Sequence, residues 1–121
     1  MKRRFRFVVQ EHHAERAGLH YDVRLERGNV LKSWAFRYPP PLKRGVKRLG
    51  IPQPDHELSY IDFEGVIEEG YGKGTVKIWD RGEYVLLDED ADRLVIYFNG
   101  QKLKGVYIFL KWRKGWLLFR K

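Results

Sequence analysis

The sequence of 121 residues contains no cysteine, one methionine and no long hydrophobic run. Without cysteine the chain has no disulfide, thiolate metal site, iron–sulfur cluster or cysteine nucleophile, so histidines and carboxylates are its available metal ligands. Apolar stretches such as residues 106–110 are too short to span a bilayer. The first residues alternate charged and aromatic side chains. We therefore expect no secretory signal peptide, no membrane association and a cytoplasmic protein.

The rest of the composition is that of a folded domain with an excess of basic residues. Hydrophobic residues make up 43% of the chain and aromatic residues 15%, which is enough to bury a core and excludes a disordered chain. This length has room for one domain, which we expect to span residues 1–121. Lys and Arg number 24 against 16 Asp and Glu, a net charge of +8. Residues 1–60 hold 13 basic and 6 acidic residues, whereas residues 61–121 hold 11 and 10. The basic first half favours a polyanionic partner such as nucleic acid.

Aromatic and β-branched residues alternate with polar ones in short runs, and this period-two pattern predicts β-strands. We expect strands over residues 3–10, 19–27, 30–36, 59–64, 75–79, 84–88, 93–98, 105–112 and 116–120. A turn at Arg81 and Gly82 is predicted to separate the strands over 75–79 and 84–88. The glycine-rich segment 70–74 lacks the spacing of a nucleotide-binding loop and precedes a strand, so we interpret it as a tight turn.

Two segments do not fit the strand pattern. Residues 11–18 are predicted to form a single helical turn that ends at Gly18, and a short helix is expected near residues 43–49 within the basic, proline-rich segment 37–58. Eight or nine strands in one small chain leave exposed edges unless the sheet closes. The predicted fold is therefore dominated by β-structure: a small closed or nearly closed antiparallel β-barrel with one or two short flanking helices.

Residues 19–26 carry an unusual set of polar side chains. Alternation along a strand places His20, Asp22, Arg24 and Glu26 on one face. An imidazole and a carboxylate two residues apart can bind one metal ion, and the planar guanidinium of Arg24 suits the oxygens of a phosphate. The alternative is a solvated strand face with a hydrogen bond between His20 and Asp22 and an ion pair between Arg24 and Glu26.

Three of the four histidines, His12, His13 and His20, fall within nine consecutive residues. Two imidazoles together with the nearby carboxylate satisfy the ligand set of a Mn, Fe or Zn site that keeps open positions. The fourth histidine, His56, lies in a proline-rich approach to a predicted strand, and Tyr60 follows it four residues later. We expect His56 and Tyr60 to face the same pocket as the histidine cluster.

Several motifs in the same order resemble one family, the 3′-phosphoesterase module of DNA ligase D, the bacterial end-joining ligase, which also occurs as a free-standing protein. The strong similarity covers residues 5–82. The motifs are FVVQ at 7–10, His-x-Ala at 12–14, LHYDVRLE at 19–26, LKSWA at 31–35, Asp-His at 55–56, Tyr60, DFEG at 62–65, Tyr-Gly at 71–72, Gly74 and IWD at 78–80.

The resemblance implies a manganese-dependent enzyme, with Zn²⁺ or Co²⁺ as alternative ions, in a small β-barrel flanked by short helices. Such an enzyme removes a 3′-terminal ribonucleoside and then the 3′-phosphate from a DNA or primer end, leaving a 3′-OH for repair ligation. The resemblance also implies roles for particular residues: metal ligands His12, His20 and Asp22, phosphate contacts Arg24 and His56, and a catalytic group of His20, Arg24, His56 and Tyr60. Two extra residues near Ala17 and Gly18 leave His13 as an alternative to His12.

Further expectations concern the substrate and partners. Arg48, in the basic run over residues 43–48, is our candidate for a contact with the phosphate backbone. Two departures from the family pattern, Tyr38 in place of a basic residue and Pro54 in place of an acidic one, are predicted to weaken the ribonuclease step more than the phosphatase step. The expected substrates are 3′ ends of DNA or RNA-tailed DNA, the expected partner is a separate ligase or polymerase, and the protein is expected to be a monomer.

Two other functions fit the same residues. A His-x-Asp pair on a barrel strand with a distant histidine also matches the facial triad of non-heme iron oxygenases, in which Arg24 would bind a substrate carboxylate. A non-catalytic nucleic-acid-binding barrel would use the basic first half and exposed rings without any metal. The basic charge favours a nucleic-acid substrate over the small acid of an oxygenase.

Overall fold

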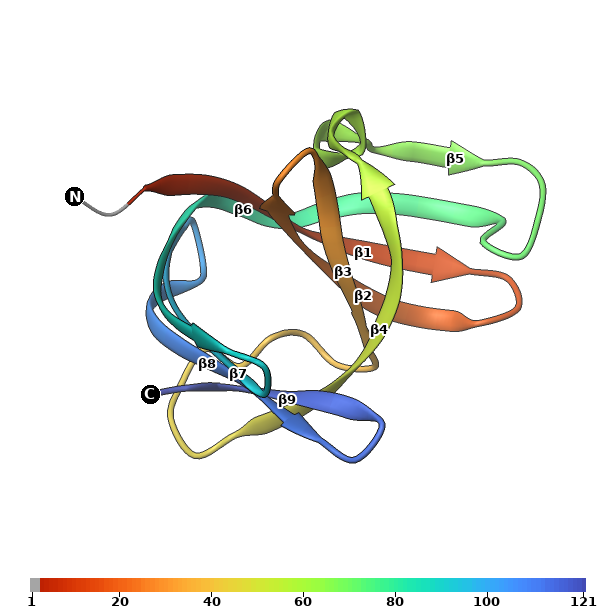
Figure 1. Ribbon diagram of the computed structural model, residues 1–121. Coiled ribbons are helices and arrows are strands. Elements are labelled where there is room, and N and C mark those ends of the chain that lie inside the picture. The colour runs from red at the N-terminus through yellow and green to blue at the C-terminus, as the bar shows by residue number, and fades with distance from the viewer. Residues whose placement is uncertain (1–2) are drawn as a thin grey trace.

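Antiparallel strands account for most of the chain in the computed structural model, which describes residues 3–121 (Figure 1). The strands are β1 (Arg4–Ala14), β2 (Gly18–Arg27), β3 (Val30–Phe36), β4 (Lys47–Glu57), β5 (Gly65–Ile67), β6 (Gly74–Asp90), β7 (Arg93–Gly100), β8 (Lys104–Trp112) and β9 (Gly115–Arg120). One short 3₁₀ helix, η1 (Leu58–Asp62), follows β4. The described residues contain no helix that is long and apolar enough to cross a membrane.

Eight of these strands close into a barrel, as predicted. They follow the order β1-β2-β3-β4-β9-β8-β7-β6, and a further pairing between β1 and β6 joins the two ends. The long strand β6 makes this closure possible because it pairs with β1 over one part of its length and with β7 over another. The short strand β5 adds to β6 outside the ring of eight. Closure satisfies the backbone groups that an open sheet would expose at its edges.

The barrel interior is filled by side chains from alternate positions of the strands. The core contains Phe7, Val9, Val23 and Leu25 from β1 and β2, packed with residues from β3, β6, β7, β8 and β9. Each fully buried large apolar side chain contributes about 1.5–3 kcal/mol of transfer free energy. The intervening residues of β1 and β2 point to the opposite face, where a smaller apolar cluster forms from Val8, Leu31 and Ile61.

Both predicted flanking helices are wrong. Residues 11–18 form the end of a hairpin, in which β1 continues to Ala14 and β2 begins at Gly18. His12 lies between two strands, since it pairs with His20 of β2 and Val76 of β6, and this pairing outweighs the local helix propensity of the segment. Near residues 43–49 the chain makes a turn at residues 44–45, with Gly45 at a φ of 88°, and then enters β4.

The expected strand over residues 59–64 is also wrong, because η1 occupies residues 58–62. Leu58 and Ile61 are three residues apart, which is the repeat of a 3₁₀ helix, and both pack on the smaller apolar cluster. The turn of η1 places Tyr60 beside the end of β4. The 3₁₀ helix η1 is the only helix among the described residues.

Strand β4 was not predicted because of Pro52 and Pro54. Strand β9 pairs with β4 only over residues 47–50, so beyond Gly50 one side of β4 is an edge within the described chain. Proline is tolerated at an edge because no neighbouring strand needs its missing N–H. Because the two prolines do not interrupt it, β4 continues to Glu57, and His56 near its end pairs with Leu31 of β3.

The predicted turn at Arg81 and Gly82 is absent, and the two expected strands on either side form the single strand β6. Gly82 instead lies so close to β7 that a Cβ atom would collide with the backbone oxygen of Asn99. Glycine at this position permits a close approach of two strands rather than a reversal of the chain. The predicted turn over residues 70–74 is present, at residues 71–72.

Candidate active site

Strand pairing gathers polar side chains on the face of β1–β4 that points away from the barrel core. His12 lies opposite His20, and Gln10 lies opposite Asp22. On the other side of β2, Arg24 pairs with Ser33. Because side chains at paired positions of antiparallel strands lie about 5 Å apart, this register brings residues from β1, β2 and β3 into one cluster.

His12, His20 and Asp22 form the group best suited to hold a metal. One ligand atom from each lies within 4.8 Å of the other two. The Oδ2 atom of Asp22 is 3.3 Å from Nε2 of His20 and 3.7 Å from Nδ1 of His12. Asp22 and His12 are buried, and the side chain of His20 is mostly covered. Three donors of these types at this spacing match a divalent metal site that leaves positions for substrate or water.

The outward-facing ring nitrogens fix the orientation of both histidines. Nε2 of His12 lies 2.7 Å from the carbonyl oxygen of Gly72, and Nδ1 of His20 lies 3.2 Å from that of Gly18. A carbonyl only accepts, so each of these nitrogens must donate a proton to it. In the neutral form that binds a cation, the other nitrogen of each ring presents its lone pair to the space between the three residues, whereas without a cation the hydrogen bond of His20 with ionised Asp22 requires a proton on Nε2 as well. Such backbone partners are typical of metal-ligating histidines, and the residues present therefore fit a bound cation.

The charge balance of the cluster keeps Asp22 ionised. Burial opposes ionisation of this carboxyl, but its hydrogen bond with His20 and the positive charge of Arg24 outweigh burial and lower its pKa. The same hydrogen bond with Asp22 raises the pKa of His20, against the opposing effect of burial. A carboxylate ionised at neutral pH is the form that binds a cation.

Arg24 lies beside Asp22 and is only 4% exposed. Nε donates to Oε1 of Gln10 at 2.6 Å, and Nη1 donates to Oγ of Ser33 at 2.8 Å. Nη2 lies 3.4 Å from Oδ2 of Asp22. Burial lowers the pKa of Arg24, and Asp22 opposes this shift. The guanidinium is thus a fixed positive charge within the cluster, with most of its donors already used by protein acceptors.

His56 and Tyr60 cover Arg24 from the side of β4 and η1. Nη1 of Arg24 lies 3.1 Å from Nδ1 of His56, and the guanidinium carbon is 5.0 Å from the centre of the Tyr60 ring. The two rings contact each other at a centroid distance of 4.9 Å. Burial and the charge of Arg24 lower the pKa of His56. Nδ1 of His56 also lies 3.1 Å from the carbonyl oxygen of Pro54, so this nitrogen faces both a donor and an acceptor, and its two contacts favour opposite protonation states.

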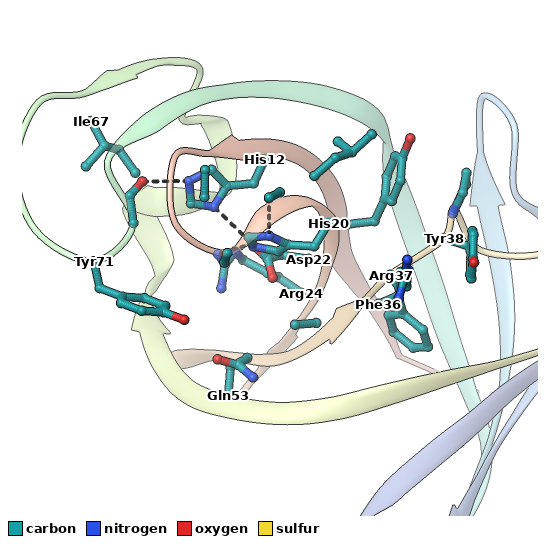
Figure 2. A pocket seen from close by; sticks show the side chains of 18 of the residues that line it. His12, His20, Asp22, Arg24, Phe36, Arg37, Tyr38, Gln53, Ile67 and Tyr71 are labelled. Atoms are coloured by element: carbon teal, nitrogen blue, oxygen red, sulfur yellow. Dashed lines mark hydrogen bonds and ion pairs between the residues drawn. The ribbon is translucent and has the colours of Figure 1, made fainter.

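A cavity of about 1060 Å³ contains all six of these residues in its lining: His12, His20, Asp22, Arg24, His56 and Tyr60. Figure 2 shows the two histidines meeting above Asp22, with Tyr71 and Gln53 on one side and Arg37 and Tyr38 on the other. The structure thus brings together the candidates from β1, β2, β4 and η1, which are separated by up to 48 positions in the chain.

Other sequence candidates lie elsewhere. Nε2 of His13 contacts the Glu11 carboxylate at 2.8 Å and its side chain is half exposed, so the group of candidate ligands contains His12 and not His13. Glu26 bonds with Arg6 rather than with Arg24, so the ion pair expected for a solvated strand face is not formed. Arg48 does not line the cavity.

Two residues of the cluster were not singled out from the sequence. Gln10 is fully buried, and its amide group donates to the carbonyl oxygens of Tyr60 and Phe63 while its oxygen accepts from Arg24. Ser33, the second of these residues, accepts a hydrogen bond from Nη1 of Arg24. Both lie within motifs that carry the family resemblance, so the signal was present, but an isolated Gln or Ser in a strand gives no indication that it is buried.

Comparison with known proteins identifies the family. The family model of the DNA ligase D 3′-phosphoesterase domain matches residues 10–111. The chain is 46% identical over 106 residues to the multifunctional non-homologous end joining protein LigD of Pseudomonas aeruginosa, a match that covers 83% of this chain and 12% of that protein. The corresponding protein of Mycobacterium bovis is 42% identical over 110 residues, with 87% and 14% covered. That of Mycolicibacterium smegmatis is 38% identical over 128 residues, with 95% and 16% covered.

The chain spans 12–16% of the length of these relatives. The match nevertheless extends over most of this chain, and the family model begins at Gln10 and passes through every residue of the cavity cluster. The resemblance inferred from the sequence motifs is confirmed, and the chain belongs to the DNA ligase D 3′-phosphoesterase domain family.

Proposed function

We propose that residues 1–121 form one metal-dependent phosphoesterase domain that repairs DNA 3′ ends during non-homologous end joining. It removes a 3′-terminal ribonucleoside and then the remaining 3′-phosphate, which leaves a 3′-OH for a ligase. The observation that carries this proposal is the set of ligands His12, His20 and Asp22 beside the buried cation Arg24 in one cavity. Family membership and the end-joining names of the relatives support the reaction class and its setting.

The three ligands define what the cation contributes. We propose Mn²⁺ as the ion, with Zn²⁺ and Co²⁺ as alternatives, since two imidazoles and one carboxylate suit all three. When bound, such an ion polarises the phosphate oxygens and lowers the pKa of a coordinated water. Asp22 supplies the anionic ligand, and its Oδ2 atom lies within 4 Å of both histidines and of Arg24.

Arg24 and His56 act on the phosphate in this proposal. In each step water attacks phosphorus and one P–O bond breaks, first to the departing nucleoside and then to the 3′ oxygen of the remaining strand. The fixed charge of Arg24 stabilises the negative charge of the transition state, and its contacts with Gln10 and Ser33 prevent reorientation during the reaction. A proton on the His56 imidazole is available to a phosphate oxygen or to the leaving oxygen. Tyr60 holds the His56 ring by contact.

Product analysis with defined ends tests the proposal. Duplexes that carry a 3′-terminal ribonucleotide or a 3′-phosphate are incubated with chelator-treated protein, to which Mn²⁺, Zn²⁺, Co²⁺ or Mg²⁺ is added separately. We expect conversion of both ends to 3′-OH with Mn²⁺ and none after chelation. The ratio of the two rates also measures whether Tyr38 and Pro54 weaken the ribonuclease step, as predicted from the sequence.

Other outcomes would favour the alternative functions. No end processing with any of the four ions would contradict the proposed reaction. Binding to DNA that survives complete chelation, without processing, would favour a non-catalytic nucleic-acid-binding barrel. Oxygen uptake with Fe²⁺ and a small carboxylic acid would favour an oxygenase. A monomeric, cytoplasmic protein that works beside a separate ligase or polymerase remains our expectation for its setting.

A further inference from the structure

Three tyrosines with accessible rings line the cavity, and two of them are already engaged by the protein. Tyr60 stacks on Phe63 at a centroid distance of 4.9 Å and carries Arg24 on its ring. Tyr38 lies beside two guanidiniums, those of Arg37 at 5.7 Å and Arg48 at 5.0 Å from the ring centre. Tyr60 is half-buried by these contacts, and Tyr38, although 52% exposed, already carries two cations at its ring.

Tyr71 is different. Its exposed fraction is 70%, the largest of any large hydrophobic residue in the described chain. Within residues 3–121 no aromatic ring or cation packs on it. Figure 2 shows its ring extending from the β5–β6 loop into the cavity, on the side of His12 and Ile67. An exposed ring inside a substrate cavity, with its faces unused, is suited to stack on another flat group.

The backbone that carries this ring is held next to the metal-ligand group. The neighbouring residue, Gly72, accepts the hydrogen bond from Nε2 of His12 at 2.7 Å. The following residue, Lys73, accepts at its carbonyl from the backbone N–H of Glu15 at 2.8 Å, and their side chains form an ion pair at 3.4 Å. Tyr71 therefore projects from a loop whose position is fixed relative to the ligands.

Charge distinguishes the two ends of the cavity. Tyr71 and Tyr38 lie on opposite sides of the His20 and Asp22 pair in Figure 2. Arg37 and Arg48 gather at the Tyr38 end, where a phosphate backbone is favoured. The loop of Tyr71 instead contains the exposed residues Glu68 and Glu69, which disfavour phosphates. The Tyr71 end thus suits a group without further phosphates.

We infer that Tyr71 stacks on the base of the 3′-terminal nucleoside, the group that departs in the first step of the proposed function, on which this inference rests. The terminal nucleoside has no phosphate beyond the scissile one, so it matches the Tyr71 end, while the upstream strand lies toward Arg37 and Arg48. The 3′-phosphate end produced in the first step carries no such base. Tyr71 is therefore a specificity residue for the ribonuclease step alone.

Three substrates test this inference: duplexes ending in a 3′-ribonucleotide, in a 3′-terminal ribose that lacks the base, and in a 3′-phosphate. We expect Tyr71→Ala to lower kcat/KM for the base-bearing end by about 5- to 150-fold, the range for removal of one base-stacking ring. The variant should process the abasic and 3′-phosphate ends like the wild type. Tyr71→Phe, which keeps the ring, should retain activity on all three. Tyr97→Ala, which removes an exposed tyrosine on β7 outside the cavity, is the matched control.

The outcomes separate the inference from the function beneath it. A loss by Tyr71→Ala that is equal on all three ends would overturn the inference, because the ring would then only support the loop and His12. Unchanged activity on the base-bearing end would overturn it as well. A wild-type protein that processes none of the ends with any divalent ion would instead refute the proposed function, and the inference would fall with it. Thermal unfolding of each variant verifies that the barrel is intact.

Discussion

Strand β2 has two faces that are buried alike and differ in chemistry. Tyr21, Val23 and Leu25 are at most 8% exposed and point into the barrel core, while Asp22 and Arg24 are at most 5% exposed and point to the cavity. Burial of the first set stabilises the fold through the hydrophobic effect. Burial of charges costs free energy unless they are paired and hydrogen-bonded. The comparison indicates that one face supplies stability and the other supplies function.

The largest expected effect follows from Asp22→Ala. The change removes the carboxylate that the two histidines share and leaves Arg24 without its anionic partner. We expect activity on both ends to fall at least about 1000-fold, since the ion contributes several kcal/mol to the transition state. Initial rates with Mn²⁺ measure this loss. Asp55→Ala removes an exposed carboxylate that pairs with Lys32 at 3.0 Å and should leave the rates unchanged. Unaltered metal-dependent turnover in Asp22→Ala would contradict the ligand assignment.

Arg24→Lys should have the next largest effect. Lysine keeps the charge but loses the planar fork that contacts Gln10, Ser33 and His56 together. We expect kcat to fall by about 100-fold on both ends, as for the loss of one positioned transition-state donor. Arg27→Lys alters an ion pair with Glu89 at the end of the same strand and is the control. If Arg24→Lys retained full activity, the positive charge alone would suffice and the fixed orientation would have no role.

Val23→Ala probes the core face of the same strand. Removing two buried methyl groups should lower the free energy of unfolding by about 1–3 kcal/mol, which includes the cavity left behind. Denaturant unfolding measures it, with Val66→Ala, whose side chain is 64% exposed, as the matched control. The activity per folded molecule should stay within about twofold, because the Val23 side chain packs in the core and does not line the cavity, although its neighbours Asp22 and Arg24 do. A large loss of activity without a loss of stability would show that the two faces are not separate in function.

The two faces also differ in how well they could be predicted. Alternation in residues 19–26 correctly placed the polar side chains on one face and the apolar ones on the other. The alternation does not predict which other elements pack over the polar face and bury it. The cover comes from β4 and η1, and β4 was missed because its prolines are acceptable only at an edge, and the sequence does not show which part of a strand is an edge of the sheet.

The selection of His12 over His13 also depended on pairing with a distant segment. Both residues have the same chemistry and neighbouring positions, but only His12 faces Gly72 and Asp22. The local composition of residues 11–18 favoured a helical turn, and the strands on both sides of β1 override that preference. The closed barrel was predictable from the number of strands and the turns, whereas the register that builds the cluster was not.

Arg48, which contacts the cavity residue Tyr38 but does not itself line the cavity, should have a smaller effect. Its guanidinium lies beside Tyr38, and its Nε is buried without a hydrogen-bond partner among the described residues. We expect Arg48→Gln to weaken binding of a duplex end by a few fold and to reduce the slope of log K against log salt by about 0.9 for one lost phosphate contact. Fluorescence anisotropy at several salt concentrations measures both. Lys104→Gln, an exposed residue outside the cavity, is the control. An unchanged slope would place the DNA backbone elsewhere.

The smallest expected effect is a pH dependence of stability that originates at His56. Burial and the charge of Arg24 lower the pKa of this histidine, so the folded state binds its proton less readily than the unfolded state, where the pKa is about 6.5. Its contribution is therefore fully present above that value and is lost as the pH falls through it toward the lowered pKa of the folded state.

His56→Gln isolates this contribution, because glutamine cannot take up a proton while the carboxylates and other histidines titrate in both proteins. In metal-free protein, the stability advantage of the wild type over the variant should be larger at pH 8 than at pH 5, by urea unfolding at the two values. The difference is small because the ring is partly open to solvent, which screens the charge of Arg24. An advantage that grows toward pH 5 would mean that protonated His56 is stabilised in the folded state. In that case the contact of Nδ1 with the carbonyl oxygen of Pro54 would outweigh its contact with Arg24, and the polar face of β2 would end at Arg24 rather than extend to β4.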